Sequence, residues 1–258
     1  MFSRSGKSAI ALSLTSVLYL TMSKQDIAGL EIKLGYSFKN KGLLSEALTH
    51  KSFHHENPGK APLYNERLEF LGDSVLGLVV VEFLFRSDKN YSESTMSKIK
   101  SYLVKESVLS DVAEGILLGT YLRLGRGEEE TGGREKKSIL ADAMEAVFGA
   151  IYCDRGYESA RDVILRLLTD KIEAATSSEQ FFDFKTDLQE ESQVRFGVLP
   201  QYKMVKQEGE EHKKMFTIDV FIKGDKFGRG AGRSKKEAET AAAKEALAKL
   251  KVDLLSIK

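Results

Sequence analysis

A long apolar segment that carries three acids places the tightest constraint on how this chain folds. In "NERLEFLGDSVLGLVVVEFLF", leucine and valine recur at helical spacing, which predicts a helix over residues 65–86. A helix that is apolar nearly all round belongs at the centre of a domain. Yet Glu66, Glu69 and Asp73 stand at i, i+3 and i+7, so nearly two turns place all three carboxylates on one face.

A second apolar segment repeats this combination. In "SILADAMEAVFGAIY", Asp142 and Glu145 stand at i and i+3. Acids on an amphipathic helix are ordinarily solvated, but these two segments offer little polar surface. Buried carboxylates that lie close together must hold a proton or a cation, and Arg67 is the only basic residue nearby in the sequence.

A bound divalent cation would satisfy both groups of acids. Oxygen ligands without a set of Cys or His residues favour Mg²⁺ or Mn²⁺ over Zn²⁺. Such a cation can activate water and stabilise a leaving oxygen, which points to phosphoryl chemistry, although other metal enzymes also use carboxylates.

The pattern of the sequence changes once along the chain, from helical segments to a mixture of helices and strands. Residues 24–175 read as all-α, and "TSSEQ" starts a short polar linker at 176–181. Residues 182–252 then show the order α-β-β-β-α, which predicts a small α+β domain. Within the first region we expect two short helices before residue 54, loops at 54–65 and 124–137, one or two helices over 92–116, and helices at 138–156 and 157–175.

Residues 1–23 form an unusual leader. The stretch 8–22 is apolar and follows two basic residues, like a signal peptide, but it is short for a membrane span. We favour a true start at Met22, with a membrane-tethered form as the alternative. The single cysteine, Cys153, fits a reducing compartment, and we interpret it as a small buried hydrophobic residue rather than a nucleophile. We therefore expect a cytoplasmic protein.

Four segments together resemble the ribonuclease III family. They are "ALTHKSF", "NERLEFLGDSVLG", "LGRGEEETGG" and "SILADAMEAVFGAIYCDRG", and they occur in the family's order. The resemblance implies an all-α nuclease domain followed by a double-stranded-RNA-binding domain. It also implies Mg²⁺-dependent hydrolysis of double-stranded RNA to 5′-phosphate and 3′-hydroxyl ends by a homodimer that processes precursor ribosomal and messenger RNAs. Mn²⁺ is a possible substitute, and no small-molecule cofactor is expected.

The resemblance also implies roles for individual acids. Glu69, Asp142 and Glu145 match the metal ligands, and Asp73 and Glu145 match the catalytic carboxylates. Glu66 matches an acid of the valley that holds RNA, and so does Glu93, which could equally be an acid favoured by the dipole at a helix start. We expect Asn65 to cap the helix that follows it.

The second domain carries a local excess of cations. Residues 223–236 contain six Lys or Arg and one acid, and a cationic helix start suits phosphate. The resemblance to double-stranded-RNA-binding domains assigns the phosphate contacts to Ser234, Lys235 and Lys236. It also implies that Thr186, Gln189, Glu190 and Gln193 face a minor groove and that His212 makes a contact from a loop. In this chain, however, "EGEEH" replaces the Gly-Pro that commonly precedes that histidine.

Two alternatives compete with these assignments. His50, His54 and His55 cluster, but no HExxH pattern or paired Cys is present, and we place His54 and His55 in a loop rather than at a metal. A non-catalytic double-stranded-RNA-binding or ribosome-assembly protein could keep the same fold. The complete set of acids favours the nuclease.

Overall fold

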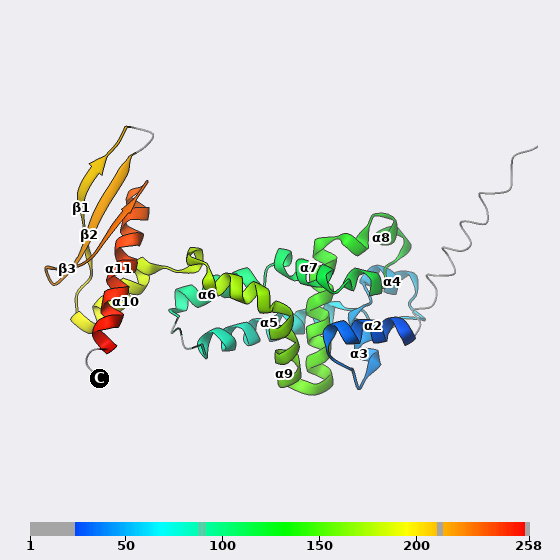
Figure 1. Cartoon of the computed structure of the whole chain (residues 1–258). Helices are drawn as coiled ribbons and strands as arrows, with labels where there is room; N and C mark the ends of the chain where they lie inside the picture. The colour runs from blue at the N-terminus through cyan, green and yellow to red at the C-terminus, as the bar shows by residue number, and fades with distance from the viewer. Residues whose placement is uncertain (1–23, 88, 90, 211–213, 256–258) are drawn as a thin grey trace, which may run out of the picture. The chain divides into compact units, whose positions relative to one another are not determined.

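The computed structural model describes residues 24–87, 89, 91–210 and 214–255 (Figure 1). The predictions for the leader and for His212 therefore lie outside the described residues. The contacts divide the chain into two compact units. One holds the residues up to 88 together with 99–177, and the other holds 89–98 together with the residues from 178 onward.

The first unit is helical, as predicted. Among its described residues, the strand-like pairing is a single parallel bridge between Thr49 and Arg123. Its elements are α2 (Lys24–Leu34), α3 (Lys41–Ala47), α4 (Lys51–Glu56), α5 (Glu66–Phe85), α6 (Glu93–Leu103, shared with the second unit), α7 (Glu106–Gly115), η1 (Leu118–Tyr121), α8 (Arg126–Glu130), η2 (Gly133–Glu135) and α9 (Lys137–Ser177).

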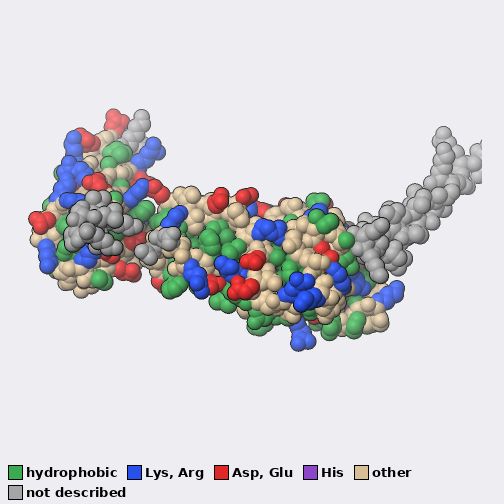
Figure 2. All heavy atoms as spheres, turned by 60° about the horizontal axis from the view of Figure 1, so that its bottom comes forward, with side chains coloured by type: hydrophobic (Ala, Val, Ile, Leu, Met, Phe, Trp, Pro, Cys, Tyr) green, Lys and Arg blue, Asp and Glu red, His purple; other side chains and the backbone are tan. Residues whose placement is uncertain are grey.

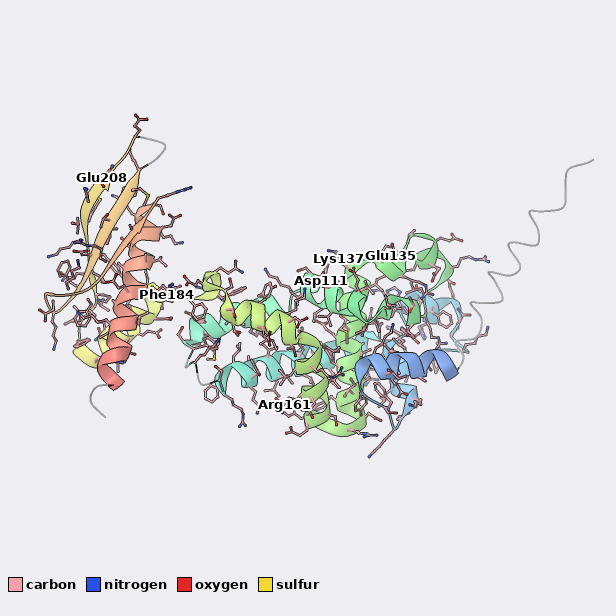
Figure 3. The ribbon with its side chains drawn as sticks, in the orientation of Figure 1. Asp111, Glu135, Lys137, Arg161, Phe184 and Glu208 are labelled. Atoms are coloured by element: carbon pink, nitrogen blue, oxygen red, sulfur yellow. The ribbon has the colours of Figure 1, made fainter. Side chains whose placement is uncertain are left out.

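Helices α5 and α9 form the centre of this unit. The apolar residues that predicted burial are buried in both, including Leu76 and Val80 on α5 and Phe148 on α9. Helix α9 contains both helices expected over 138–175, and Gly156 separates them with a φ of 79° that L side chains rarely adopt. Arg161 lies on the second segment of α9 (Figure 3). Its Nε is 3.8 Å from a carboxylate oxygen of Glu82 on α5.

Two expected loops of this unit and the expected burial of Cys153 were wrong. The loop predicted from residue 54 begins later, because His54 and His55 belong to α4, whose first turn is capped by the His50 ring. The loop predicted at 124–137 contains α8 and η2, since the Glu56 carboxylate accepts the Arg126 N–H at 2.9 Å and anchors the start of α8. Cys153 is exposed rather than buried.

The second unit has the predicted α-β-β-β-α order. Its elements are η3 (Glu179–Phe181), α10 (Phe184–Phe196), β1 (Gln201–Glu208), β2 (Met215–Ile222), β3 (Asp225–Gly232) and α11 (Lys235–Leu255). The strands form an antiparallel sheet in the order β1-β2-β3, and both long helices pack on one of its faces (Figure 1).

The glycines of β3 allow α11 to approach the sheet closely. A methyl group built on Gly230 would lie 2.2 Å from the backbone oxygen of Ala238, so a larger residue has no room there. The core beneath combines Leu188 of α10 and Val220 of β2 with the alanines of α11. Small residues on both surfaces thus define this packing.

The surface is mixed in charge. On the face shown in Figure 2, acidic and basic side chains are interspersed over both units, as the net charge of +1 leads one to expect. Within the described part of the chain, none of the helices is long and apolar enough to span a membrane.

Candidate functional site

Three carboxylates meet where α5 and α9 cross. Glu69 comes from α5, and Asp142 and Glu145 come from successive turns of α9. One oxygen of each lies within 4.8 Å of the others, and all three side chains are half-buried. The structure therefore brings together the three acids that the family resemblance assigned to a metal.

Two glycines allow this close crossing. A methyl group built on Gly72 of α5 would lie 1.8 Å from the backbone oxygen of Glu145. One built on Gly149 of α9 would lie 2.2 Å from the backbone oxygen of Leu68. Real side chains never approach so closely, so both positions require glycine for the helices to hold the three acids at these distances.

The environment disfavours negative charge on all three acids. The pKa of Glu145 is raised to about 8, mainly by burial and then by the charges of Asp73, Glu69 and Asp142. Burial, followed by neighbouring acids, also raises the pKa of Glu69 and of Asp142. The positive charge around these carboxylates is thus too small to keep their pKa values in the ordinary range.

The site fits a hard divalent cation. Mg²⁺ takes oxygen ligands at about 2.0–2.1 Å, so ligand oxygens on opposite sides of it are roughly 4 Å apart. Three carboxylate oxygens within 4.8 Å of one another need only small side-chain movements to reach that arrangement. A divalent cation would also offset the charge that raises the three pKa values.

The remaining acids of α5 lie at the rim of this group. Asp73 is exposed and outside the three-oxygen set, contrary to the inference that its apolar neighbours leave it unsolvated. It still lies close enough to raise the pKa of Glu69 and Glu145. Glu66 is exposed and pairs with Lys51, with 3.1 Å between Oε1 and Nζ.

Sequence reasoning missed Lys51 and misjudged Asn65. Lys51 lies in the motif "ALTHKSF", and its positive charge was the only signal in the sequence for a role beside the acids. Arg67, which is nearer to them in the sequence, was named as the nearby basic residue instead. Lys51 lowers the pKa of both Glu69 and Asp142, whereas Arg67 acts on Glu46. Asn65 has helical backbone angles and its side chain makes no capping bond, so the predicted cap was wrong.

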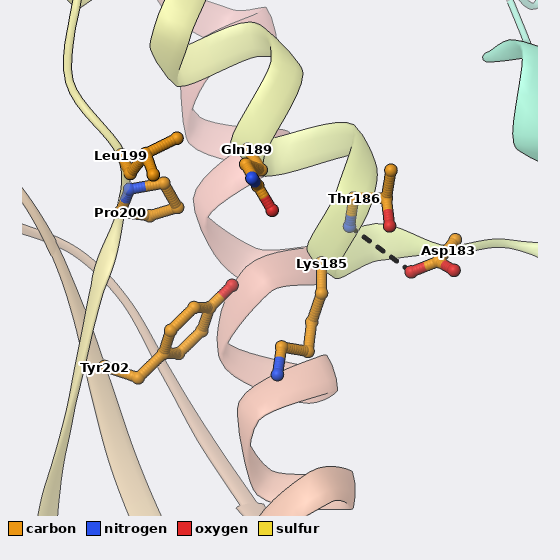
Figure 4. A pocket seen from close by; sticks show the side chains of 7 residues that line it. All are labelled: Asp183, Lys185, Thr186, Gln189, Leu199, Pro200 and Tyr202. Carbon is orange, nitrogen blue, oxygen red and sulfur yellow. Dashed lines mark hydrogen bonds between the residues drawn. The ribbon is translucent and has the colours of Figure 1, made fainter.

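One face of α10 carries the residues assigned to the minor groove. Gln189, Glu190 and Gln193 are exposed, and Thr186 is half-buried near the helix start, where Asp183 accepts its N–H at 3.3 Å. Thr186 and Gln189 also line a shallow pocket of about 360 Å³ (Figure 4), together with Asp183, Lys185, Leu199, Pro200 and Tyr202. The spacing thus presents polar side chains on a single helical face.

The start of α11 carries the residues assigned to phosphate. Lys235 and Lys236 are exposed in its first turn. The Ser234 hydroxyl accepts the Glu237 N–H at 3.1 Å, while the Glu237 carboxylate accepts the Arg233 N–H at 2.7 Å. The first bond is the serine half of a capping box, whereas Glu237 reaches the N–H of Arg233 instead of that of Ser234. Ser234 thus has a structural role that the sequence assignment did not include.

The cationic cluster is smaller than the sequence indicated. Asp219 of β2 is buried and lies beside β3, where its carboxylate accepts bonds from Arg229 at 2.6 and 2.9 Å and lies 2.9 Å from Lys226. The hydrogen bond from Arg229 is the main cause that lowers the pKa of Asp219 to about 2. Two of the six cations are therefore paired within the sheet.

Glu93 remains a prediction. It is exposed in the first turn of α6 and belongs to the second unit by its contacts. Both interpretations of this residue, as an RNA-facing acid and as an acid at a helix start, stay open.

Comparison with known proteins identifies both parts of the chain. Residues 40–172 match the model of the family described as ribonuclease-III-like, and residues 184–250 match the double-stranded RNA binding motif. The chain is 45% identical over 226 residues to ribonuclease 3 of Syntrophotalea carbinolica, covering 88% of this chain and 97% of that protein. It is 47% identical over 228 residues to ribonuclease 3 of Clostridium perfringens, covering 88% and 95%.

A solved structure supports the same assignment for the helical unit. The nuclease domain of ribonuclease III from Campylobacter jejuni is 45% identical and superposes with a TM-score of 0.52, covering 56% of this chain and 96% of that domain. Sequence and structure agree, and the chain belongs to the ribonuclease III family of endoribonucleases.

Proposed function

We propose that this endoribonuclease cleaves double-stranded RNA with a Mg²⁺ ion held by Glu69, Asp142 and Glu145. The observation that carries the proposal is the convergence of these three carboxylates, within 4.8 Å, at a helix crossing that admits only glycine. Mn²⁺ also suits this set of oxygen ligands. Such an ion, when bound by these residues, would activate a water and stabilise the leaving 3′-oxygen of the phosphodiester.

The protein's own acids position the reaction. Glu145, which is ionised when it holds the cation, fixes the site between α5 and α9. Asp73 is exposed beside Glu145 and Glu69, so its carboxylate is placed to accept a hydrogen bond from the attacking water. Hydrolysis then leaves a 5′-phosphate and a 3′-hydroxyl, and Glu66 and Glu93 belong to the valley that holds the RNA.

The second unit binds the substrate by its shape. We assign the nuclease domain to residues 24–175, the linker to 176–181 and the RNA-binding domain to 182–252. Thr186, Gln189, Glu190 and Gln193 suit the 2′-hydroxyls of a minor groove, and Lys235 and Lys236 suit phosphates across the major groove. His212 keeps the loop contact that the family resemblance implies. Such recognition depends on A-form geometry more than on base sequence.

An apolar stripe on α5 supports a homodimer. Phe70 is 80% exposed and Phe85 is 76% exposed, with Leu78 and Val81 exposed between them at helical spacing. Large apolar side chains that are exposed in a row mark an interface. The Campylobacter jejuni structure describes a region of the nuclease domain involved in dimer formation. We place the partner's copy of α5 against this stripe, so that each subunit cuts one strand.

The cellular role follows from the family. We propose that the protein acts in the cytoplasm on precursor ribosomal and messenger RNAs. The exposed thiol of Cys153 fits a reducing compartment.

Incubation with a long perfect RNA duplex tests the function. The chain should release short duplexes with 5′-phosphate ends in the presence of Mg²⁺ and leave the duplex intact in EDTA. Single-stranded RNA and duplex DNA serve as matched substrates that should remain uncut. Binding of the duplex without cleavage under Mg²⁺ or Mn²⁺ would contradict the proposal and support the non-catalytic RNA-binding protein.

A further inference from the structure

The proposed active site carries more negative charge than one ion can offset. Five carboxylates lie in or beside it, those of Glu66, Glu69, Asp73, Asp142 and Glu145. An RNA strand adds a phosphate charge for every nucleotide that approaches them. Electrostatic repulsion between the strand and these acids must therefore be offset by positive charge at the same place.

Lys51 provides positive charge there. Its ammonium lies 3.1 Å from the Glu66 carboxylate. Glu66 precedes Glu69 by about one turn of α5, so this ammonium lies at the edge of the group of acids. Its side chain is 55% exposed, so it is accessible to a ligand that enters the site from solvent.

The backbone around Lys51 is firmly held. The His50 ring accepts the Ser52 N–H at 3.3 Å, and the Ser52 hydroxyl accepts the Gly125 N–H at 2.8 Å. The Thr49 carbonyl accepts the Asn65 N–H at 2.9 Å, which ties this segment to the start of α5. An exposed ion pair such as Lys51–Glu66 contributes little to stability. The position of the Lys51 ammonium therefore depends mainly on these backbone hydrogen bonds.

The Lys51 ammonium has more hydrogen-bond donors than its pair with Glu66 uses. It carries three N–H groups, and one carboxylate cannot take them all. We propose that Lys51 binds a backbone phosphate of the strand being cut and positions that strand over Glu69, Asp142 and Glu145, with Glu66 holding the lysine in place. This inference rests on the proposed function and adds a substrate-positioning residue to it.

Steady-state cleavage of a short duplex tests the role of the side chain. Lys51→Ala should raise KM by about tenfold, the usual scale for losing one charge-assisted phosphate contact, and change kcat much less. Lys51→Arg should restore KM because the guanidinium also binds phosphate. Lys41→Ala is the matched control, since Lys41 is a half-exposed lysine paired with Glu31 away from the acids, and it should leave KM unchanged.

A double substitution separates RNA binding from a purely structural pair. If Lys51 contacts the phosphate, Lys51→Ala should still raise KM when Glu66→Gln has already removed the ion pair. If Lys51 serves only to neutralise Glu66, the lysine substitution should have no effect in that background. The second result would overturn the inference.

RNA binding supplies a readout that does not require cleavage. In full-length protein carrying Glu145→Gln, Lys51→Ala should reduce the slope of log affinity against log salt by about one, and Lys41→Ala should not. Equal slopes for the two variants would also overturn the inference. Failure of the unsubstituted protein to cut any duplex would instead contradict the proposed function. In that case the salt slopes would still show whether Lys51 binds a phosphate.

Discussion

Gly72 of α5 and Gly149 of α9 meet at the helix crossing, where a methyl group on Gly149 would lie 3.1 Å from the Gly72 nitrogen and 2.2 Å from the Leu68 oxygen. Because Glu145 lies one turn before Gly149, the separation of the two backbones there sets the separation of Glu69 from Glu145. The metal site thus depends on two residues that have no side chain to contribute to it.

Gly149→Ala should therefore impair both stability and activity. Overpacking of this kind costs roughly 1–3 kcal/mol, and widening the crossing should raise the Mg²⁺ concentration for half-maximal cleavage at least about tenfold. Thermal unfolding and Mg²⁺ titration of the cleavage rate measure the two effects. Gly115→Ala is the control, because a methyl group at this helical position meets nothing within 4 Å; equal behaviour of the two variants would refute the packing argument.

Glu145→Gln should abolish cleavage while RNA binding persists. The amide keeps the shape of the side chain but removes its charge, so the loss of rate should be on the order of 10²–10⁴. Duplex binding should change little, because the proposed RNA contacts of the second unit are untouched. Parallel cleavage and gel-shift assays measure both, with Glu114→Gln on exposed α7 surface as the control. Loss of binding together with cleavage would show that Glu145 is structural.

The stability of the metal-free protein should depend on pH through Glu145. Its pKa of about 8 in the folded state lies above the ordinary 4.5, so folding takes up a proton between those values. Stability should fall as pH rises through this window, and Mg²⁺ should slow that fall, because the ion stabilises the ionised carboxylate in the folded state. Melting temperatures in EDTA and in Mg²⁺ from pH 5.5 to 8.5 measure the effect. Glu145→Gln should flatten the EDTA curve, and an unchanged curve would rule out this source.

Two apolar helices that must pack together, each with embedded acids, predicted a carboxylate site between them. The family resemblance, rather than the spacing, singled out Glu69, Asp142 and Glu145 as its ligands. It did not reveal the pairing of Lys51 with Glu66, which depends on the backbone bond between Thr49 and Asn65 across a loop. Helix α4 was missed since a six-residue helix has too few turns to show periodicity. Local patterns thus indicate burial, whereas tertiary contacts decide which charges meet.

The same limitation affects the RNA-binding unit. The six cations of residues 223–236 include Lys226 and Arg229, which antiparallel pairing of β2 and β3 brings beside Asp219. The cations that remain at the start of α11 are consequently more important for RNA than the count implied.

Replacing Lys235 and Lys236 with alanine should weaken binding of every duplex by a similar factor. Each lost phosphate contact should lower the slope of log affinity against log salt by about one, so the double variant should lose about two. Anisotropy titrations at several salt concentrations measure this. The control variant, Lys244→Ala with Lys249→Ala, removes the same charge from later turns of α11, and an equal loss there would indicate a general electrostatic effect rather than contacts at the helix start.

Ser234 allows helix capping and RNA binding to be separated. Ser234→Ala removes the acceptor for the Glu237 N–H and should cost about 1 kcal/mol of stability. Ser234→Asp keeps a good cap and places a negative charge favourably at the helix start, so the melting temperature should be retained. The same charge should repel a phosphate bound at Lys235 and Lys236, and duplex affinity should fall by about tenfold or more at low salt. If the phosphate binds at this helix start, Ser234→Asp should be the more stable of the two variants and also the one that binds duplex more weakly. Wild-type affinity in Ser234→Asp would show that the phosphate binds elsewhere.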